Sequence, residues 1–243
     1  MATIRFCLDF GNTRKKLGYF QGDLLINEIM LRENTLEHIQ ELVERHKPAA
    51  AILSSDVDYA AEIDAYLHEK TNFIKLTHET KLPFLNAYGT PTTLGRDRIA
   101  MVAGLSKFYP GENALAISIG SCITYSFLAK NNAFRGGAIS PGIHMRLKAL
   151  NEHTDNLPLV SSQGYDALMG FDTETSIRSG VLNGMTAEID GMIERFEEQY
   201  GKVNAVLTGG DTRYFARQLK KKIFADEFFV LKGLYAILEY HDA

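Results

Sequence analysis

The fold is decided by one stretch near the amino terminus, Ile4-Arg5-Phe6-Cys7-Leu8-Asp9-Phe10-Gly11-Asn12-Thr13. Apolar side chains at every second position predict a strand, and the glycine that follows predicts a turn. A second apolar run ends near residue 20, and Gln21-Gly22-Asp23 predicts a hairpin before a third run. We therefore expect three hairpin-linked strands at the start of the chain.

The same pattern returns in the second half of the chain. Residues 114–118 form an apolar run that leads into a second glycine turn, Ser118-Ile119-Gly120-Ser121-Cys122. Two further strands are expected, the last ending near Gly136-Gly137. Repeated units of this kind each supply half of a shared site. We expect an α/β fold with two duplicated halves, residues 1–112 and 113–243.

Helical spacing and turn signals give the other expected elements. Helices are predicted over 35–46, 58–70, 95–108, 142–152, 173–200 and 211–222. Buried strands are predicted over 50–54, 73–76, 203–207 and 228–231.

The composition excludes several classes of protein. Of 243 residues 45% are hydrophobic, and a net charge of -4 provides no basic surface for nucleic acid. The two cysteines, Cys7 and Cys122, are too far apart for a zinc motif or a disulfide framework. No apolar run approaches the ~20 residues of a membrane span, and the strand-like start leaves no signal-peptide core. We expect a cytoplasmic protein that binds neither membrane nor nucleic acid.

The first glycine turn has the chemistry of a phosphate site. Its backbone N–H groups, with Asn12 and Thr13 as extra donors, suit phosphate oxygens. Asp9 cannot bind phosphate directly and would act through Mg²⁺. A plain β-turn in which Asp9 bonds its own backbone is the alternative. The matching turn at 118–122 favours the phosphate interpretation.

A second candidate is Gly95-Arg96-Asp97-Arg98, at the start of an expected helix. A carboxylate there is often only a cap. The two arginines would keep Asp97 ionised, as a base for an alcohol requires. Two strand–glycine–helix connections, at 136–142 and 208–211, would either let the backbone approach a ligand or be only tight connections.

Five segments together resemble the type III pantothenate kinase family over nearly the whole chain. They are Asp9-x-Gly11-Asn12-Thr13, Gly95-x-Asp97-Arg98, Ser118-x-Gly120-Ser121, Gly136-Gly137-x-Ile139-x-Pro141-Gly142 and Thr208-Gly209-Gly210. The resemblance implies the duplicated ribonuclease-H-like fold of the actin, hexokinase and Hsp70 superfamily, two βββαβαβα halves around a central cleft. It also implies ATP-dependent phosphorylation of pantothenate to 4'-phosphopantothenate, the first step of coenzyme A biosynthesis.

The resemblance also implies roles for single residues. Asp97 would be the general base that takes the proton from the primary hydroxyl of pantothenate. The pantothenate site would comprise Tyr88, Gly95, Arg96, Asp97 and Arg98, with Thr173 reaching it across a homodimer interface. The contacts with ATP and Mg²⁺ would come from Asp9, Phe10, Gly11, Asn12, Thr13, Arg14, Lys15, Lys16 and Ser121. Lys15 and Lys16 alternatively face solvent.

The second turn departs from the family at Ser118, where the family has an aspartate that binds a monovalent cation, commonly K⁺. Ser121 keeps the hydroxyl of the family threonine. Ser118 as a metal ligand, and with it a requirement for K⁺ or NH₄⁺, is therefore in doubt. Two alternatives to the pantothenate kinase remain: another small-molecule kinase of the superfamily, or a nucleotide-binding regulator without turnover.

Overall fold

The computed structural model describes residues 3–11 and 13–242. They form two compact units. The first comprises the residues up to 110, residues 132–135 and those from 228 onward. The second comprises residues 111–131 and 136–227. The final helix thus packs within the first unit, and the division at residue 112 expected for the duplicated halves stays a prediction.

The first unit is built on a five-stranded sheet with the order β3-β2-β1-β4-β5. The first three strands are antiparallel, and β4 and β5 continue the sheet in parallel. Its strands are β1 (Ile4–Phe10), β2 (Lys15–Gln21), β3 (Leu24–Met30), β4 (Ala50–Ser55) and β5 (Asn72–Lys75). The short strand β6 (Leu85–Asn86) pairs with the first residues of β9 (Ala133–Pro141).

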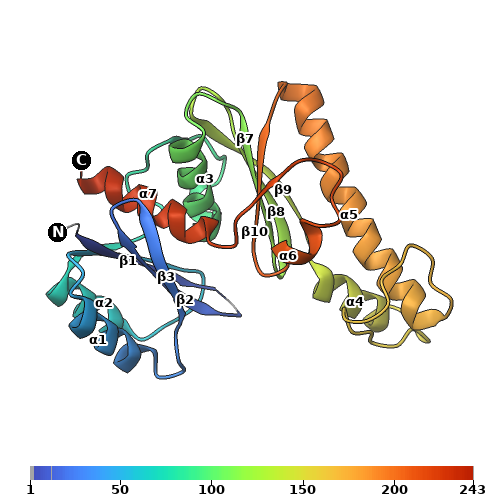
Figure 1. The fold of residues 1–243 in the computed structure, drawn as a ribbon, viewed down its shortest axis with the longest axis horizontal. Helices are drawn as coiled ribbons and strands as arrows, with labels where there is room; N and C mark the ends of the chain where they lie inside the picture. Colours follow the sequence, from blue (N-terminus) through green and yellow to red (C-terminus); the bar gives the residue numbers. More distant parts are fainter. Residues whose placement is uncertain (1–2, 12, 243) are drawn as a thin grey trace. The chain divides into compact units, whose positions relative to one another are not determined.

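Helices cover both faces of this sheet (Figure 1). The apolar side chains of β1 at Phe6, Leu8 and Phe10 pack on α1 (Thr35–His46) and α2 (Ala61–Lys70). The opposite face meets α7 (Phe229–Asp242), where Phe20 stacks on Tyr235 with ring centroids 4.6 Å apart. The helix α3 (Arg96–Phe108) packs on α7 and follows the 3-10 turn η1 (Pro91–Thr93).

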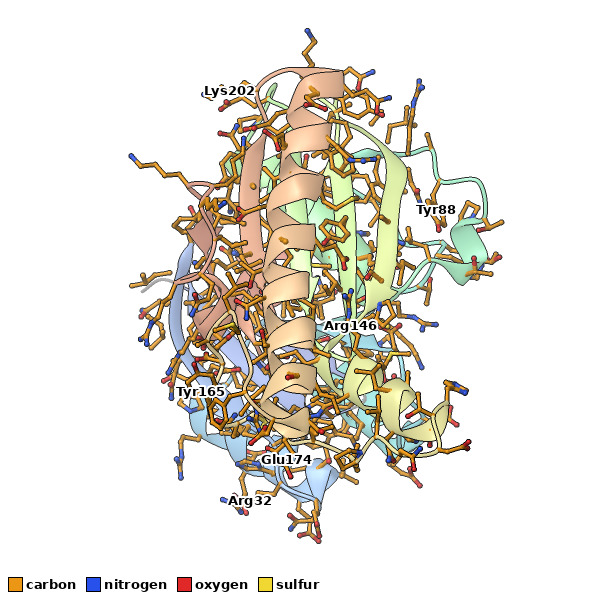
Figure 2. All side chains as sticks on the ribbon, turned by 90° about the vertical axis from the view of Figure 1, so that its right-hand side faces the viewer. Arg32, Tyr88, Arg146, Tyr165, Glu174 and Lys202 are labelled. Carbon is orange, nitrogen blue, oxygen red and sulfur yellow. The ribbon has the colours of Figure 1, made fainter. Side chains whose placement is uncertain are left out.

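The second unit repeats this plan. Its strands follow the order β9-β8-β7-β10-β11, which matches β3-β2-β1-β4-β5. Besides β9, its elements are β7 (Ala114–Ile119), β8 (Cys122–Leu128), α4 (Ile143–Glu152), α5 (Thr173–Tyr200), β10 (Asn204–Thr208), α6 (Thr212–Phe215) and β11 (Phe224–Ala225). Figure 2 shows α5 lying lengthwise along the sheet, with Glu174 near one end and Lys202 beyond the other. The common strand order confirms the duplication expected from the sequence.

Three expected elements were wrong. The helix predicted over 211–222 is one turn, α6, because the N–H groups of Lys220 and Lys221 bond to the Asp190 carboxylate instead of continuing a helix. The strand predicted over 228–231 is the start of α7, whose apolar side chains are buried along the helix. The strand β9 continues through Gly136-Gly137 and ends at Pro141.

Neither a membrane span nor a disulfide was expected. No helix in the described part of the chain is long and apolar enough to cross a bilayer. Both cysteines are free, Cys7 buried and Cys122 partly exposed.

Candidate active site

The two glycine turns occupy equivalent positions in the two sheets. Asp9, near the end of β1, lies in register with Lys16 on β2 and Ser54 on β4. Ser118 on β7 lies in register with Thr124 on β8 and Thr208 on β10. Residues in register point to the same face of a sheet. We call the second set, Thr124, Ser118 and Thr208, the hydroxyl row.

Three carboxylates gather at the carboxyl end of the first sheet, and we call Asp9, Asp56 and Asp97 the acidic cluster. Asp9 points to the face that α7 covers, since Phe6, Leu8 and Phe10 take the other face. Asp56 follows β4, and its N–H group donates to the carbonyl of Phe10 at 3.2 Å.

Burial and the charges within the acidic cluster raise the pKa values of Asp9 and Asp97. Burial, together with the charges of Asp97 and Asp56 and against the opposing charge of Lys16, raises the pKa of Asp9 to about 7. Excess negative charge of this kind is what a divalent cation offsets. Within residues 3–11 and 13–242, no three His, Cys, Asp or Glu side chains are arranged to hold a metal ion by themselves. Mg²⁺ usually takes one or two carboxylates together with phosphate oxygens and waters, so the acidic cluster fits Mg²⁺ bound with a nucleotide.

Asp97 lies in the first turn of α3. Its Oδ1 accepts the N–H of Arg98 at 2.7 Å, and a Cβ on Gly95 would lie 2.7 Å from the same oxygen. Gly95 therefore makes room for the carboxylate. Burial and the charge of Asp56 raise the pKa of Asp97, against the N–H and the charge of Arg98. Burial thus outweighs the charge of Arg98 in setting the pKa of Asp97, and the higher pKa makes Asp97 a stronger base.

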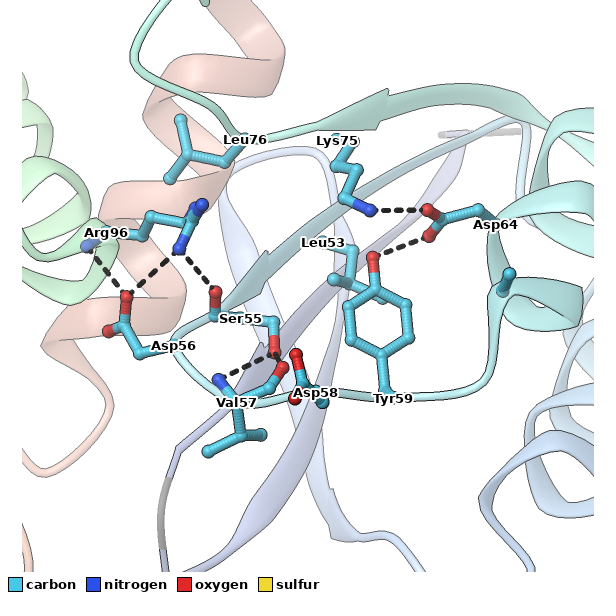
Figure 3. Close-up of a pocket in the computed structure, with 11 residues that line it drawn as sticks. Leu53, Ser55, Asp56, Val57, Asp58, Tyr59, Asp64, Lys75, Leu76 and Arg96 are labelled. Carbon is cyan, nitrogen blue, oxygen red and sulfur yellow. Dashed lines mark hydrogen bonds and ion pairs between the residues drawn. The ribbon is translucent and has the colours of Figure 1, made fainter. Parts of the chain in front are cut away.

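Arg96 ties the start of α3 to the loop after β4 (Figure 3). Its Nη1 donates to the carbonyl of Ser55 at 2.8 Å, and its backbone N–H donates to Oδ1 of Asp56 at 3.2 Å. Arg96 also lines a cavity of about 590 Å³ in the first unit. Across that cavity the Asp64 carboxylate accepts from both Lys75 and Tyr59, at 2.7 Å each.

Arg98 and Tyr88, both predicted substrate residues, lie together. The guanidinium carbon of Arg98 is 5.6 Å from the centroid of Tyr88 and 5.7 Å from that of Phe134. The two rings stack with centroids 5.8 Å apart, and Arg98 is only 5% exposed. Such stacking fixes the orientation of a guanidinium. Phe134 was missed, because an aromatic residue in a strand pattern looks like ordinary core.

The first glycine turn exposes two of its described residues. The N–H of Gly11 donates to the carbonyl of Arg14 at 3.0 Å, and Thr13 and Arg14 are exposed. Lys16 pairs with Glu28 at 2.9 Å, and the ammonium of Lys15 lies 5.4 Å from the Phe10 ring centroid. The other predicted donor, Asn12, lies outside the described residues.

The second turn offers no carboxylate in the hydroxyl row. Ser121 is exposed and Ser118 partly exposed, whereas Oγ1 of Thr124 and Oγ1 of Thr208 are buried with no hydrogen-bond partner among the described residues. A site for K⁺ needs several oxygen ligands, charged or neutral, and this row presents one accessible neutral hydroxyl. The hydroxyl row therefore does not fit the monovalent cation.

Thr173, the remaining predicted residue, is exposed in the first turn of α5 and directly follows the capping residue Asp172.

Asp9→Asn is expected to stabilise the ligand-free protein in a pH-dependent way. The folded state holds the Asp9 proton up to about pH 7, whereas the unfolded chain releases it near 3.8, so ionisation destabilises the fold progressively between these values. The free energy of unfolding of Asp9→Asn should exceed that of wild type most at pH 8 and least at pH 4.5, by urea denaturation. Glu62→Gln, an exposed change on α2, should show no such trend; a pH-independent effect of Asp9→Asn would contradict the shift.

Known proteins are similar to this chain over nearly its whole length. Residues 5–195 match the family model described as type III pantothenate kinase. A type III pantothenate kinase from Phocaeicola vulgatus is 41% identical over 236 residues, which cover 97% of this chain and 98% of the relative. One from Christiangramia forsetii is 39% identical over 237 residues, covering 96% of this chain and 97% of the relative.

Solved structures share the fold at low identity. A Baf family protein from Campylobacter jejuni superposes with a TM-score of 0.60 at 21% identity, covering 98% of each chain. The ROK hexokinase of Thermus thermophilus superposes with a TM-score of 0.50 at 13% identity, covering 99% of this chain and 100% of the hexokinase. With the repeated strand order, these similarities confirm the duplicated ribonuclease-H-like fold.

Proposed function

Because the chain belongs to the type III pantothenate kinase family, whose members use ATP to phosphorylate pantothenate, we propose that Asp97 is the general base of that reaction. The observation that carries the proposal is the position of Asp97. It stands in the first turn of a buried helix, electrostatically coupled to Asp9 and adjacent to Arg98. A buried carboxylate of raised pKa beside a buried arginine is the arrangement expected of a base that acts on an alcohol.

In the proposed mechanism, Asp97 takes the proton from the primary hydroxyl as that oxygen attacks the γ-phosphorus of ATP. The bond between the γ-phosphorus and the bridging oxygen breaks at the same time, and ADP is the leaving group. Arg98, held beside the stacked rings of Tyr88 and Phe134, pairs with the pantothenate carboxylate, since a fixed guanidinium suits a planar anion. The exposed turn at Gly11 and Thr13 and the Ser121 hydroxyl contact the phosphates. Positioning and charge neutralisation supply most of the rate enhancement in such transfers.

In this proposal Asp9 of the acidic cluster would hold Mg²⁺, and the bound ion would supply positive charge against the negative charge of the phosphates. No step depends on a monovalent cation, because the hydroxyl row does not fit one. The proposal also includes a cytoplasmic homodimer in which Thr173 of one chain reaches the pantothenate bound to the other.

The experiment is a measurement of ADP release by the purified protein with ATP and Mg²⁺. We expect release only when pantothenate is added, at equal rates in potassium chloride and in choline chloride. Release with acetate or a sugar instead would identify another kinase of the superfamily, and ATP binding without release would identify a regulator. A rate that collapses without potassium would contradict the assignment of the hydroxyl row as a site without a cation.

A further inference from the structure

The second glycine turn is supported from behind by the connection between β9 and α4. The N–H of Gly142 donates to the carbonyl of Ser121 at 3.0 Å. A Cβ at position 142 would lie 2.1 Å from the carbonyl oxygen of Gly120, so the two backbones are in direct contact. Whatever fixes residues 140–142 therefore also fixes the turn that carries Ser121.

One side chain, Arg146, fixes that connection. Its Nε donates to the carbonyl of Pro141 at 2.8 Å, and its Nη2 donates to the Ser140 hydroxyl at 2.7 Å. Its backbone N–H donates to the carbonyl of Gly142 at 3.1 Å. Arg146 thus bonds to the last two residues of β9 from the first turn of α4.

The guanidinium is itself anchored from a third element, as its position beside α5 in Figure 2 indicates. It forms an ion pair with Glu188 on α5, and the other oxygen of Glu188 accepts the Tyr125 hydroxyl at 3.3 Å. Burial, with the charge of Glu188, raises the pKa of Tyr125, so the phenol stays protonated and donates. The contacts run from α5 through Arg146 to Pro141, Gly142 and the turn.

Taken alone, the positive charge of Arg146 near the N-terminal end of α4 would destabilise that helix. The N-terminal end of a helix disfavours a positive charge, and the first turn of α4 contains no acidic residue. Glu188 supplies the compensating charge from outside the helix. The charge of Arg146 therefore does not stabilise α4; its hydrogen bonds stabilise the connection between β9 and α4.

We propose that Arg146 is a positioning residue for nucleotide binding: with Glu188 it holds residues 140–142 against the second glycine turn and so sets the place of Ser121. This inference rests on the proposed function of that turn in binding ATP. Arg146 touches neither nucleotide nor pantothenate in this role, so its loss weakens ATP binding and leaves pantothenate binding unaffected.

The test measures binding of a non-hydrolysable ATP analogue with Mg²⁺ by calorimetry, beside the KM values for ATP and pantothenate. We expect Arg146→Ala to raise the Kd of the analogue and the KM for ATP about tenfold, or ~1.4 kcal/mol. The KM for pantothenate should stay unchanged. Arg146→Lys keeps the positive charge but cannot bond to both Pro141 and Ser140 as the guanidinium does. Its Kd for the analogue and its KM for ATP should therefore lie between those of wild type and Arg146→Ala.

Two further variants keep the result interpretable. Lys148→Ala removes an exposed cation on α4 that pairs with Glu152 at 3.4 Å, and it should bind the analogue as wild type does. Glu188→Gln keeps the shape and removes the anchoring charge, so it should weaken binding less than Arg146→Ala. Unchanged analogue binding in Arg146→Ala, or an equal loss of pantothenate affinity, overturns the inference. Because analogue binding needs no turnover, failure of the pantothenate assay is a separate outcome.

Discussion

Replacing Asp97 with Asn is expected to lower kcat for pantothenate phosphorylation by a factor of about 10²–10⁴, the usual range for loss of a general base. The amide oxygen can still accept the N–H of Arg98, which Asp97 accepts at 2.7 Å, so the start of α3 should keep its geometry. The amide cannot take a proton from the substrate hydroxyl. Steady-state kinetics with saturating ATP and pantothenate measure the effect.

The control for Asp97→Asn is Glu62→Gln, which removes an exposed carboxylate of the same unit and should leave kcat unchanged. The Kd for the ATP analogue should change little in Asp97→Asn, or fall slightly, because a negative charge near the phosphates is removed. A variant that keeps wild-type turnover would exclude Asp97 as the base and would leave Asp9 and Asp56 as the carboxylates to examine.

Gly233→Ala on α7 is expected to lower the stability of the fold strongly. A Cβ at this position would lie 1.8 Å from the carbonyl oxygen of Ala100 on α3, so the two helices would have to separate. Introducing atoms into a packed interior costs about 1–3 kcal/mol, and a clash between two backbones belongs at the upper end or beyond. For a chain of this size, each kcal/mol lowers the Tm by about 2–4 °C.

Gly184→Ala on α5 is the matched control for Gly233→Ala. Gly184 is exposed on the helix, and a Cβ there would meet no atom within 4 Å. Alanine at such a position should raise stability by up to ~1 kcal/mol, through the lower backbone entropy of the unfolded chain. The two substitutions should therefore shift the Tm in opposite directions, and equal shifts would refute the close contact between α3 and α7.

The elements that the sequence predicted well are those with a local signal. Alternating apolar residues located β1, a continuous apolar run located β7, and a glycine turn followed each; the repeat predicted that Asp9 and Ser118 would be equivalent. The error at residues 228–231 arises because tertiary packing overrides the local signal there. Phe228, Phe229 and Val230 have strand propensity, but packing on α3 and the sheet selects a helix.

The candidate site was predicted only in part, through segments whose residues lie close together in the sequence. Gly95 and Asp97 belong to one short segment and were found together. Asp56 lies 41 residues before Asp97, and its charge acts on Asp97 only through the fold. Phe134 leaves no local signature, whereas Asp56, a carboxylate directly after a buried strand, carries a signal that could have indicated it.

The packing of α7 in the first unit also has a consequence for synthesis of the protein on the ribosome. The face of β1, β2 and β4 that α7 covers is made early, but residues 229–242 emerge only after all of the second unit. While residues 111–227 are translated, Phe20 has no Tyr235 to stack on and that apolar face has no partner helix. The second unit can therefore complete its folding first, and the first unit, which carries Asp97, can do so only after α7 has been made.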